Sequence, residues 1–305
     1  MTKVKDTNHN ILAQELIEKN FNRKHIDVKL REAIEANPRT MAQLEHGISL
    51  VEKLLEGAYY ESKNIRFAQV REMVVEDMVM EIFIGSCYCQ KAELFTSVSA
   101  QMASRLNFSD RVDAIATVAE IMAVLCETDA FDIFKETLQS SLMVESKIEL
   151  DDELLNWISL SQYLPPMVCE PLELTHNYSS GNLTHNDSLL LGTGNHHDGD
   201  LCLDVLNTMN RVQLKLNLDF LCKVEEQPTY EIENQDQLDG WNKFKQDSYT
   251  MYSLMAKQGN RFFLTHKVDK RGRAYASGYH INTQGTPFKK AMLQLFNEEL
   301  VTGVP

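Results

Sequence analysis

Residues 269–275 read Asp269-Lys270-Arg271-Gly272-Arg273-Ala274-Tyr275 and stand in the most basic part of the chain. Residues 257–290 carry eight Lys or Arg side chains and one acidic side chain, Asp269. From residue 273 to residue 281, larger side chains alternate with mostly small ones, which is the period of two that a β-strand produces. The following Asn282-Thr283-Gln284-Gly285 has the composition of a turn. We therefore expect a basic strand and turn, followed by a helix from residue 287 to about residue 300.

The basic segment is unusual because the whole chain is acidic. Its 305 residues carry 30 Lys and Arg against 44 Asp and Glu, a formal net charge of −14. Residues 201–305 hold 13 basic and 12 acidic side chains, so the negative excess lies in residues 1–200. Such a chain repels nucleic acid unless its positive charge is concentrated. Residues 257–290 are therefore a candidate phosphate-binding surface, with a solvated basic face as the alternative interpretation.

The remaining sequence predicts mostly helices. Leu44, Ile48, Val51 and Leu55 form one apolar stripe, Asn37-Pro38 interrupts the pattern before it, and Ser109-Asp110 begins a further helix. Residues 162–200 have loop composition. Residues 203–224 and 241–255 predict two long helices that pair as an antiparallel arm. The fold class is therefore mainly α.

The ordered features from Asp269 to Lys290 resemble the phage and mitochondrial single-subunit RNA polymerases. Members of that family carry an Asp-x-x-Gly-Arg motif at the start of the palm, then a strand, an Asn-x-Gln-Gly turn and a helix that bears a lysine. This chain has Asp269, Gly272 and Arg273, then Asn282, Gln284 and Gly285, then Lys290. The resemblance extends less specifically upstream through about half of the chain, to Leu164-Pro165-Pro166-Met167 and the two long helices.

The resemblance implies a domain order. Residues 1–160 would form the helical N-terminal domain, residues 161–200 a loop-rich connector, residues 201–260 a two-helix thumb, and residues 261–305 the first strand and helix of the palm. The family's metal-binding aspartates, fingers lysine and selective tyrosine all follow the Asp-x-x-Gly-Arg motif beyond the last residue here. We therefore expect a heterodimeric polymerase of a short-tailed phage, in which a second subunit supplies the catalytic residues. A fragment of a longer enzyme is the alternative.

The resemblance also assigns roles. Arg273 would contact the DNA template or the RNA–DNA hybrid, Gly272 would permit close approach, and Asp269, Gln284 and Gly285 would support the motif. The supporting contacts would come from Arg271, Tyr275, Lys290, Lys267 and Lys270. No catalytic residue and no metal site is expected in this chain; Mg²⁺ would be bound by the partner chain. An accessory protein could recruit the enzyme to promoters, and the setting would be the cytoplasm of an infected bacterium, with no membrane contact.

Two other function classes fit parts of the sequence. A non-catalytic helical adapter would bind nucleic acid or protein through the basic segment. A metal-dependent hydrolase would use the His-rich stretch, but adjacent His196 and His197 lack the spacing of a helical metal site, which favours a polar surface loop. Asn186-Asp187-Ser188 is similar to the polymerases' His-Asp-Ser, yet it precedes the thumb. Cys87 and Cys89 lie in an apolar stretch and predict buried thiols.

Overall fold

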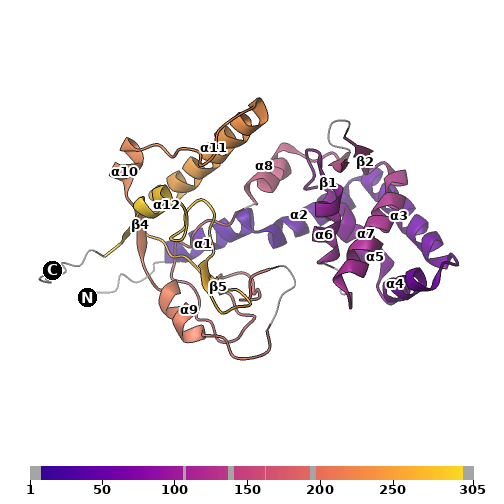
Figure 1. The fold of residues 1–305 in the computed structure, drawn as a ribbon, viewed down its shortest axis with the longest axis horizontal. Coiled ribbons are helices and arrows are strands. Elements are labelled where there is room, and N and C mark those ends of the chain that lie inside the picture. Colours follow the sequence, from indigo (N-terminus) through magenta and orange to yellow (C-terminus); the bar gives the residue numbers. More distant parts are fainter. Residues whose placement is uncertain (1–7, 106–107, 137–140, 162, 193–196, 298–305) are drawn as a thin grey trace, which may run out of the picture. The chain divides into compact units, whose positions relative to one another are not determined.

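Two parts of the chain pack separately in the computed structural model, which describes residues 8–105, 108–136, 141–161, 163–192 and 197–297. The helical unit is Arg23–Ser159, and the C-terminal unit joins the chain from Leu160 onward with the chain up to Asn22. Helices are the main regular element of the chain (Figure 1), which confirms the mainly α prediction. No helix in these described ranges is long and apolar enough to span a membrane.

Between residues 23 and 159, leaving out 106–107 and 137–140, the helical unit has seven α-helices and one small sheet. The helices are α2 (Arg23–Ala36), α3 (Pro38–Glu56), α4 (Glu61–Arg71), α5 (Val75–Ser86), α6 (Phe95–Ala103), α7 (Arg111–Leu125) and α8 (Asp152–Leu160), with a short 3₁₀ turn, η1 (Cys126–Thr128). Their apolar faces meet in one core that includes Phe67, Phe83 and Phe131. Cys87 and Cys89 are buried there, as predicted, and burial raises the pKa of both thiols to about 12.

The predicted helix starts in this unit are confirmed. Asn37 caps α3 by accepting hydrogen bonds from the backbone amides of Arg39 and Thr40, and Pro38 occupies the first turn, where no amide hydrogen is required. Asp110 caps α7 in the same way. In the stripe on α3, Leu44, Val51 and Leu55 are buried and Ile48 packs against the same core.

The expectation of an entirely helical N-terminal domain is wrong in one place. Strands β1 (Glu93–Leu94), β2 (Phe131–Lys135) and β3 (Leu142–Ser146) form an antiparallel sheet in the order β1-β3-β2. Phe131 and Val144 are fully buried. These strands are two to five residues long, too short for a clear alternating pattern. The pairing between the strands therefore decides the structure, and that pairing cannot be seen in the sequence.

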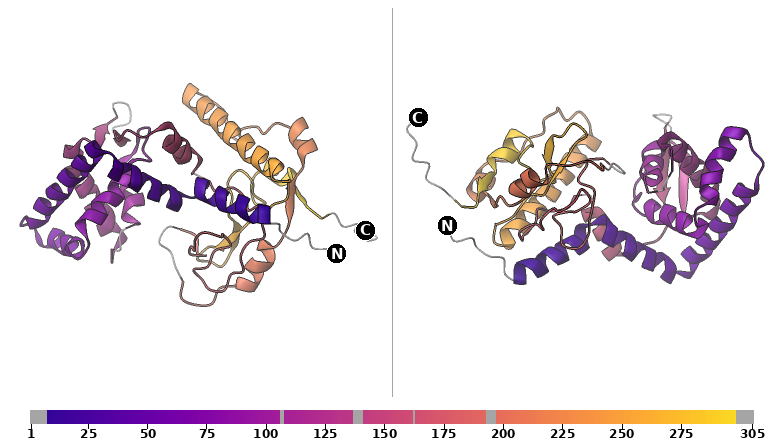
Figure 2. Two further views of the ribbon diagram at one scale, coloured as in Figure 1. Left: turned by 180° about the vertical axis from the view of Figure 1, so that it is seen from behind. Right: turned by 90° about the horizontal axis from the view of Figure 1, so that it is seen from below.

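Helix α1 (Asn8–Phe21) belongs to the C-terminal unit and not to the helices that follow it (Figure 2). Its Glu18 is fully buried and accepts hydrogen bonds from the backbone amides of Leu183 and Thr184 at 2.9 and 2.8 Å. Gln14, also buried, accepts a hydrogen bond from the Val168 amide at 2.9 Å. The compact helical unit therefore begins at Arg23, whereas the domain expected from the sequence begins at residue 1.

The C-terminal unit contains more short strands than the sequence predicts. Its other elements are α9 (Leu203–Asn210), β4 (Leu214–Leu216), α10 (Leu218–Lys223), α11 (Gln235–Lys257), β5 (His266–Val268), β6 (Ala274–Ala276), α12 (Pro287–Ala291) and β7 (Leu293–Leu295). Helix α11 confirms the predicted helix over residues 241–255, and its Ser248, Met251 and Met255 are buried.

Two long helices predicted for this unit are shorter in the structure. The helix predicted over residues 203–224 is wrong, because β4 interrupts it and pairs antiparallel with β7 through Leu214–Leu295 and Leu216–Leu293. Asn217 then caps α10 by accepting a hydrogen bond from the Phe220 amide. The same pairing ends the last helix at Ala291 instead of near residue 300. Apolar spacing alone could not separate these segments from helix, since a short apolar run suits either structure.

Residues 262–268 form the centre of this unit because they pair with four other segments. Phe262 bridges Leu214 and Phe263 bridges Met167, each in antiparallel fashion. Val268, at the end of β5, bridges Leu190 in parallel, while β5 pairs antiparallel with β6. The basic motif at residues 269–273 therefore directly follows a backbone segment that is held by several pairings.

Candidate nucleic-acid interface

The Asp-x-x-Gly-Arg motif forms the tip of a β-hairpin. Strands β5 and β6 pair through His266–Ala276, Lys267–Tyr275 and Val268–Ala274, and residues 269–273 connect them. The Asp269 amide donates to the Arg273 carbonyl at 2.9 Å and closes the loop. Gly272 has a φ of 78°, in the left-handed region that side chains with a Cβ rarely adopt. The glycine is therefore required by the turn itself.

The Asp269 carboxylate organises this tip. One of its oxygens accepts the backbone amides of Arg271 and Arg273 at 2.9 and 3.0 Å. The other lies 2.7 Å from Arg273 Nε and 2.6 Å from Arg273 Nη2. The backbone hydrogen bond from Arg273 and its guanidinium lower the pKa of Asp269. The carboxylate is therefore ionised at neutral pH and fixes the direction of the Arg273 side chain.

The basic side chains at the tip remain open to solvent. Asp269 occupies one edge of the Arg273 guanidinium, and the Arg273 side chain is still 52% exposed. Its Cζ lies 5.5 Å from the centre of the Tyr275 ring, so the ring supports its face. Lys270 and Arg271 are exposed beside it. A planar group held in this way presents its free N–H donors in a fixed direction, which suits a phosphate.

The Asn282-Thr283-Gln284-Gly285 turn bonds to the edge of β6 that does not pair with β5. The Gln284 side chain accepts a hydrogen bond from the Ala276 amide and donates one to the Ala274 carbonyl, both at 2.9 Å. It thereby pairs with β6 as a neighbouring strand would. Asn282 Nδ2 donates to the carbonyls of Ala276 and Gly278 at 3.2 and 2.6 Å. Gln284 and Asn282 thus explain physically why this turn accompanies the motif.

Replacing Gln284 by alanine should loosen the hairpin. The change removes two hydrogen bonds and leaves the Ala276 amide without its partner, which corresponds to about 1–2 kcal/mol of local stability. Hydrogen exchange at the Ala276 amide should accelerate roughly 5- to 30-fold. Thr283→Ala, at the exposed neighbouring position, is the control and should leave this exchange rate unchanged. Equal exchange in wild type and Gln284→Ala would show that the turn does not hold β6.

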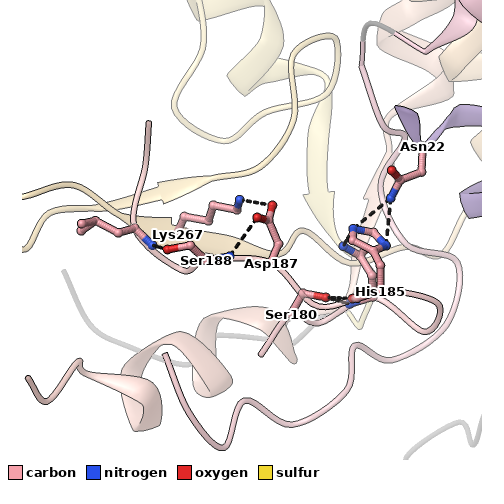
Figure 3. Close-up of polar contacts among 8 residues, drawn as sticks. Asn22, Ser180, His185, Asp187, Ser188 and Lys267 are labelled. Atoms are coloured by element: carbon pink, nitrogen blue, oxygen red, sulfur yellow. Dashed lines mark hydrogen bonds and ion pairs between the residues drawn. The ribbon is translucent and has the colours of Figure 1, made fainter. Parts of the chain in front are cut away.

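Two lysines of the predicted site, Lys267 and Lys290, do not lie at the hairpin tip with Arg273. The Lys267 ammonium lies 2.6 Å from the Asp187 carboxylate (Figure 3), so an acidic neighbour already neutralises it. Lys290, on α12, is exposed and forms no ion pair with any described residue. The structure therefore brings Asp269, Arg271, Arg273, Tyr275 and Gln284 together, and places Lys267 in an ion pair.

The His-rich stretch does not gather into one cluster. Figure 3 shows the His185 ring beside the Asn22 amide, 2.8 Å away, and the Asp187 carboxylate turned toward Lys267. His176 Nδ1 accepts the Tyr178 amide at 3.2 Å. In the part of the chain that the structure describes, no group of three or more His, Cys, Asp or Glu side chains could hold a metal ion. His196 lies outside the described residues.

A partly buried cluster of aromatic and polar side chains beside α11 was not predicted from the sequence. His280 is 4% exposed and its Nδ1 lies 2.8 Å from the Ser248 hydroxyl. The rings of Tyr163 and Tyr279 stack at 3.9 Å, and Phe244 lies 5.4 Å from the His280 ring. Trp241, Phe244 and Ser248 are spaced by three and four residues and lie on one face of α11, and that spacing is the sequence signal for this cluster.

Lowering the pH from about 6.5 to about 4 should destabilise this cluster. Burial, and then the charge of Lys289, lower the pKa of His280 from 6.5 to about 4; Lys243 acts in the same direction and Asp247 opposes them. The unfolded chain then binds the proton first, so the stabilisation is complete above pH 6.5 and is lost as the pH falls through 4. After allowance for solvent screening, we expect about 1–2 kcal/mol.

Urea unfolding of wild type and His280→Gln across this pH range measures that loss. Glutamine can still accept a hydrogen bond from Ser248 but does not titrate, so the variant should show a flatter profile. Parallel profiles for the two proteins would assign the pH dependence to other groups.

Sequence similarity to a known protein bears on the function of this chain. No family model matches the chain. A probable DNA-directed RNA polymerase from Gelasinospora sp. (strain G114) is 30% identical over 162 residues. The match covers 48% of this chain and 19% of the relative, so the chain corresponds to about a fifth of that protein's length. This similarity, together with a hairpin built around Asp269 and Arg273, supports a relationship between this chain and RNA polymerases.

Proposed function

We propose that the chain is a subunit of a phage-type DNA-directed RNA polymerase and contacts the template or the RNA–DNA hybrid through the β5–β6 hairpin. The observation that carries the proposal is the way Asp269 holds Arg273, with contacts of 2.7 and 2.6 Å from one carboxylate oxygen. Basic side chains on a face that is merely solvated would not be held in one orientation as Arg273 is. Because the chain is similar to an RNA polymerase, nucleic acid is the phosphate-bearing ligand that Arg273 would contact.

The hairpin would position nucleic acid without reading its sequence. Arg273 and Arg271 offer N–H donors suited to phosphate oxygens, and Tyr275 offers a flat ring edge beside them. Phosphate contacts fix register and orientation but carry no base information. The Gly272 turn lets the backbone approach a strand closely. These residues would therefore hold a growing hybrid while it moves.

We further propose that a partner chain supplies the reaction centre. Mg²⁺ held by that partner chain would supply the charge that orients the attacking hydroxyl and stabilises the departing pyrophosphate. The Asp269 carboxylate does not fit a metal site, because Arg273 and the two backbone amides already use its oxygens. The chain would therefore be inactive alone and active as one half of a heterodimer, in the cytoplasm of an infected bacterium.

Promoter recognition would require an accessory protein or a single-stranded DNA template. The strongly negative charge of residues 1–200 opposes binding to duplex DNA. An accessory recruitment protein or a single-stranded template would avoid that repulsion. Comparing transcription from duplex and single-stranded templates at one salt concentration tests this, and equal use of both without any accessory protein would contradict it.

The salt dependence of binding tests the hairpin's role. A fluorescently labelled RNA–DNA hybrid should bind the chain, and the logarithm of its affinity should fall linearly with the logarithm of salt concentration. Lys270→Ala should reduce that slope by about one unit, since each phosphate contact contributes roughly 0.9. Lys223→Ala, which removes an exposed lysine of α10, should leave the slope unchanged. Identical slopes for all three proteins would place the contact elsewhere.

A further inference from the structure

A cavity of about 320 Å³ opens between the first half of α11, the segment before it, and α12. Its walls include Glu226, Tyr230, Trp241, Phe244, Tyr279 and Lys289. The volume lies at the small end of the range of roughly 300–1,000 Å³ typical of small-molecule sites. The cavity therefore suits one flat ring system better than a folded peptide.

Aromatic rings give the cavity flat walls. Trp241 and Phe244 lie nearly parallel, with ring centres 5.2 Å apart and planes 25° apart. The Tyr279 ring stands at 90° to Phe244, 5.8 Å away. Every nucleobase has a π-face, and stacking of one base on an aromatic side chain contributes about 1–3 kcal/mol.

Two oppositely charged groups line the same cavity without forming an ion pair. Lys289 is 8% exposed, and its Nζ donates to the Tyr279 carbonyl at 2.6 Å, which leaves further N–H donors. Glu226 is 9% exposed, and among the described residues its side chain forms one hydrogen bond, a long one of 3.4 Å from the Thr286 hydroxyl. Burial raises the pKa of Glu226 and lowers that of Lys289, and the charge of each group partly opposes the shift of the other. Glu226 lines the cavity, and neither of its oxygens is a buried atom without a partner, so the carboxylate can accept a hydrogen bond from a group that enters the cavity.

We propose that this cavity binds an unpaired nucleobase, with guanine as the best fit. The base would stack on Trp241, accept a hydrogen bond from Lys289 and donate to Glu226. Guanine carries a carbonyl oxygen next to two N–H groups on one edge, so a single base satisfies both side chains. A cationic ligand is disfavoured, because the Lys289 ammonium already lies 4.7 Å from the Tyr279 ring centre and 5.2 Å from that of Phe244.

The site deepens the proposed function, on which it rests, by adding a base contact to the phosphate contacts of the hairpin. Tyr279 and Lys289 follow the hairpin within the same unit and belong to different side-chain clusters from Arg273. The two contacts can therefore be removed separately. A base could come from a strand of nucleic acid or from a free nucleotide, and the experiment distinguishes these sources.

Trp241 provides a direct reporter. The chain has two tryptophans, and Trp157 lies in the helical unit, so Trp157→Phe leaves Trp241 as the single indole. Guanosine monophosphate should quench its fluorescence with saturation, whereas ribose 5-phosphate and inorganic phosphate should not. A short oligonucleotide with one guanine should act at lower concentration than the monophosphate if the base comes from a strand, and at similar concentration if it comes from a free nucleotide.

Two variants link the response to the cavity. Glu226→Gln should weaken binding of guanosine monophosphate at least tenfold, because the amide cannot accept from both N–H groups of guanine. Gly240→Leu should abolish binding by filling the cavity, since a Cβ at Gly240 meets no atom within 4 Å and the fold should persist. Asn242→Leu, on the exposed side of α11, is the matched control and should bind normally.

Several results would overturn the proposal: no saturable quenching by any nucleotide, equal quenching by ribose 5-phosphate, or unchanged binding in Gly240→Leu with intact circular dichroism. A response to lysine-containing peptides instead of nucleotides would overturn it as well.

Arg273→Ala separates this site from the hairpin. Loss of hybrid binding in that variant with intact quenching by guanosine monophosphate is expected. Normal hybrid binding by wild type without any nucleotide response would remove the cavity proposal and leave the proposed function standing.

Discussion

Arg273→Ala is expected to weaken binding of an RNA–DNA hybrid by roughly 1–3 kcal/mol, which is about 5- to 150-fold in the dissociation constant. The side chain is 52% exposed and already oriented by Asp269, so no ordering is needed when a phosphate arrives. Alanine removes the charge and the planar set of donors together. Fluorescence anisotropy of a labelled hybrid at fixed salt measures the change.

Two further variants define what Arg273 contributes. Arg273→Lys keeps the charge but loses the bidentate geometry, so it should recover only part of the affinity. Lys223→Ala removes an exposed charge from the same unit and should have no effect. Arg273→Ala with wild-type affinity and wild-type salt dependence would refute the assigned contact.

Glu18→Ala is expected to destabilise the C-terminal unit by about 2–4 kcal/mol. Glu18 is fully buried and accepts hydrogen bonds from the Leu183 and Thr184 amides, the Thr184 hydroxyl and the Gln14 side chain. Hydrogen bonds to a charged group contribute about 1.5–3 kcal/mol, and alanine would leave several buried donors unsatisfied. Helix α1 should then detach from the 180–185 segment.

Urea unfolding and limited proteolysis measure that effect. We expect faster cleavage near residues 180–190 in Glu18→Ala than in wild type. Glu15→Ala, one turn earlier on the same helix and partly exposed, is the matched control and should change stability by less than about 0.5 kcal/mol. Equal stability of Glu18→Ala and wild type would mean that α1 is not an integral part of this unit.

Local sequence determines those parts of the fold that were predicted correctly. The stripe of Leu44, Val51 and Leu55 has helical spacing, and the caps Asn37 and Asp110 satisfy amides two or three residues away. The Asp269–Arg273 hairpin also depends on neighbours, because its closing contacts span at most a few residues. Interactions of this range leave a readable pattern in the chain.

Contacts between residues far apart in the sequence determine the parts of the fold and of the site that were not predicted. Strands β4 and β7 pair across about eighty residues, and Glu18 finds its partners more than 160 residues away. The charge of Glu18 suggests a solvent-exposed helix position, and only the folded backbone reveals the amides it accepts from. The aromatic cavity likewise joins α11 to Tyr279 and Lys289, so neither segment alone indicates it.

The most direct test is an RNA synthesis assay on the assembled enzyme. The tagged chain should be co-expressed with the neighbouring reading frame, purified through the tag and given a single-stranded DNA template, Mg²⁺ and nucleoside triphosphates. The account predicts that a second chain co-purifies and that RNA is made only when both chains are present, with less RNA from Arg273→Ala. A stable monomer that recruits no partner and supports no synthesis would contradict the account and favour a non-catalytic adapter.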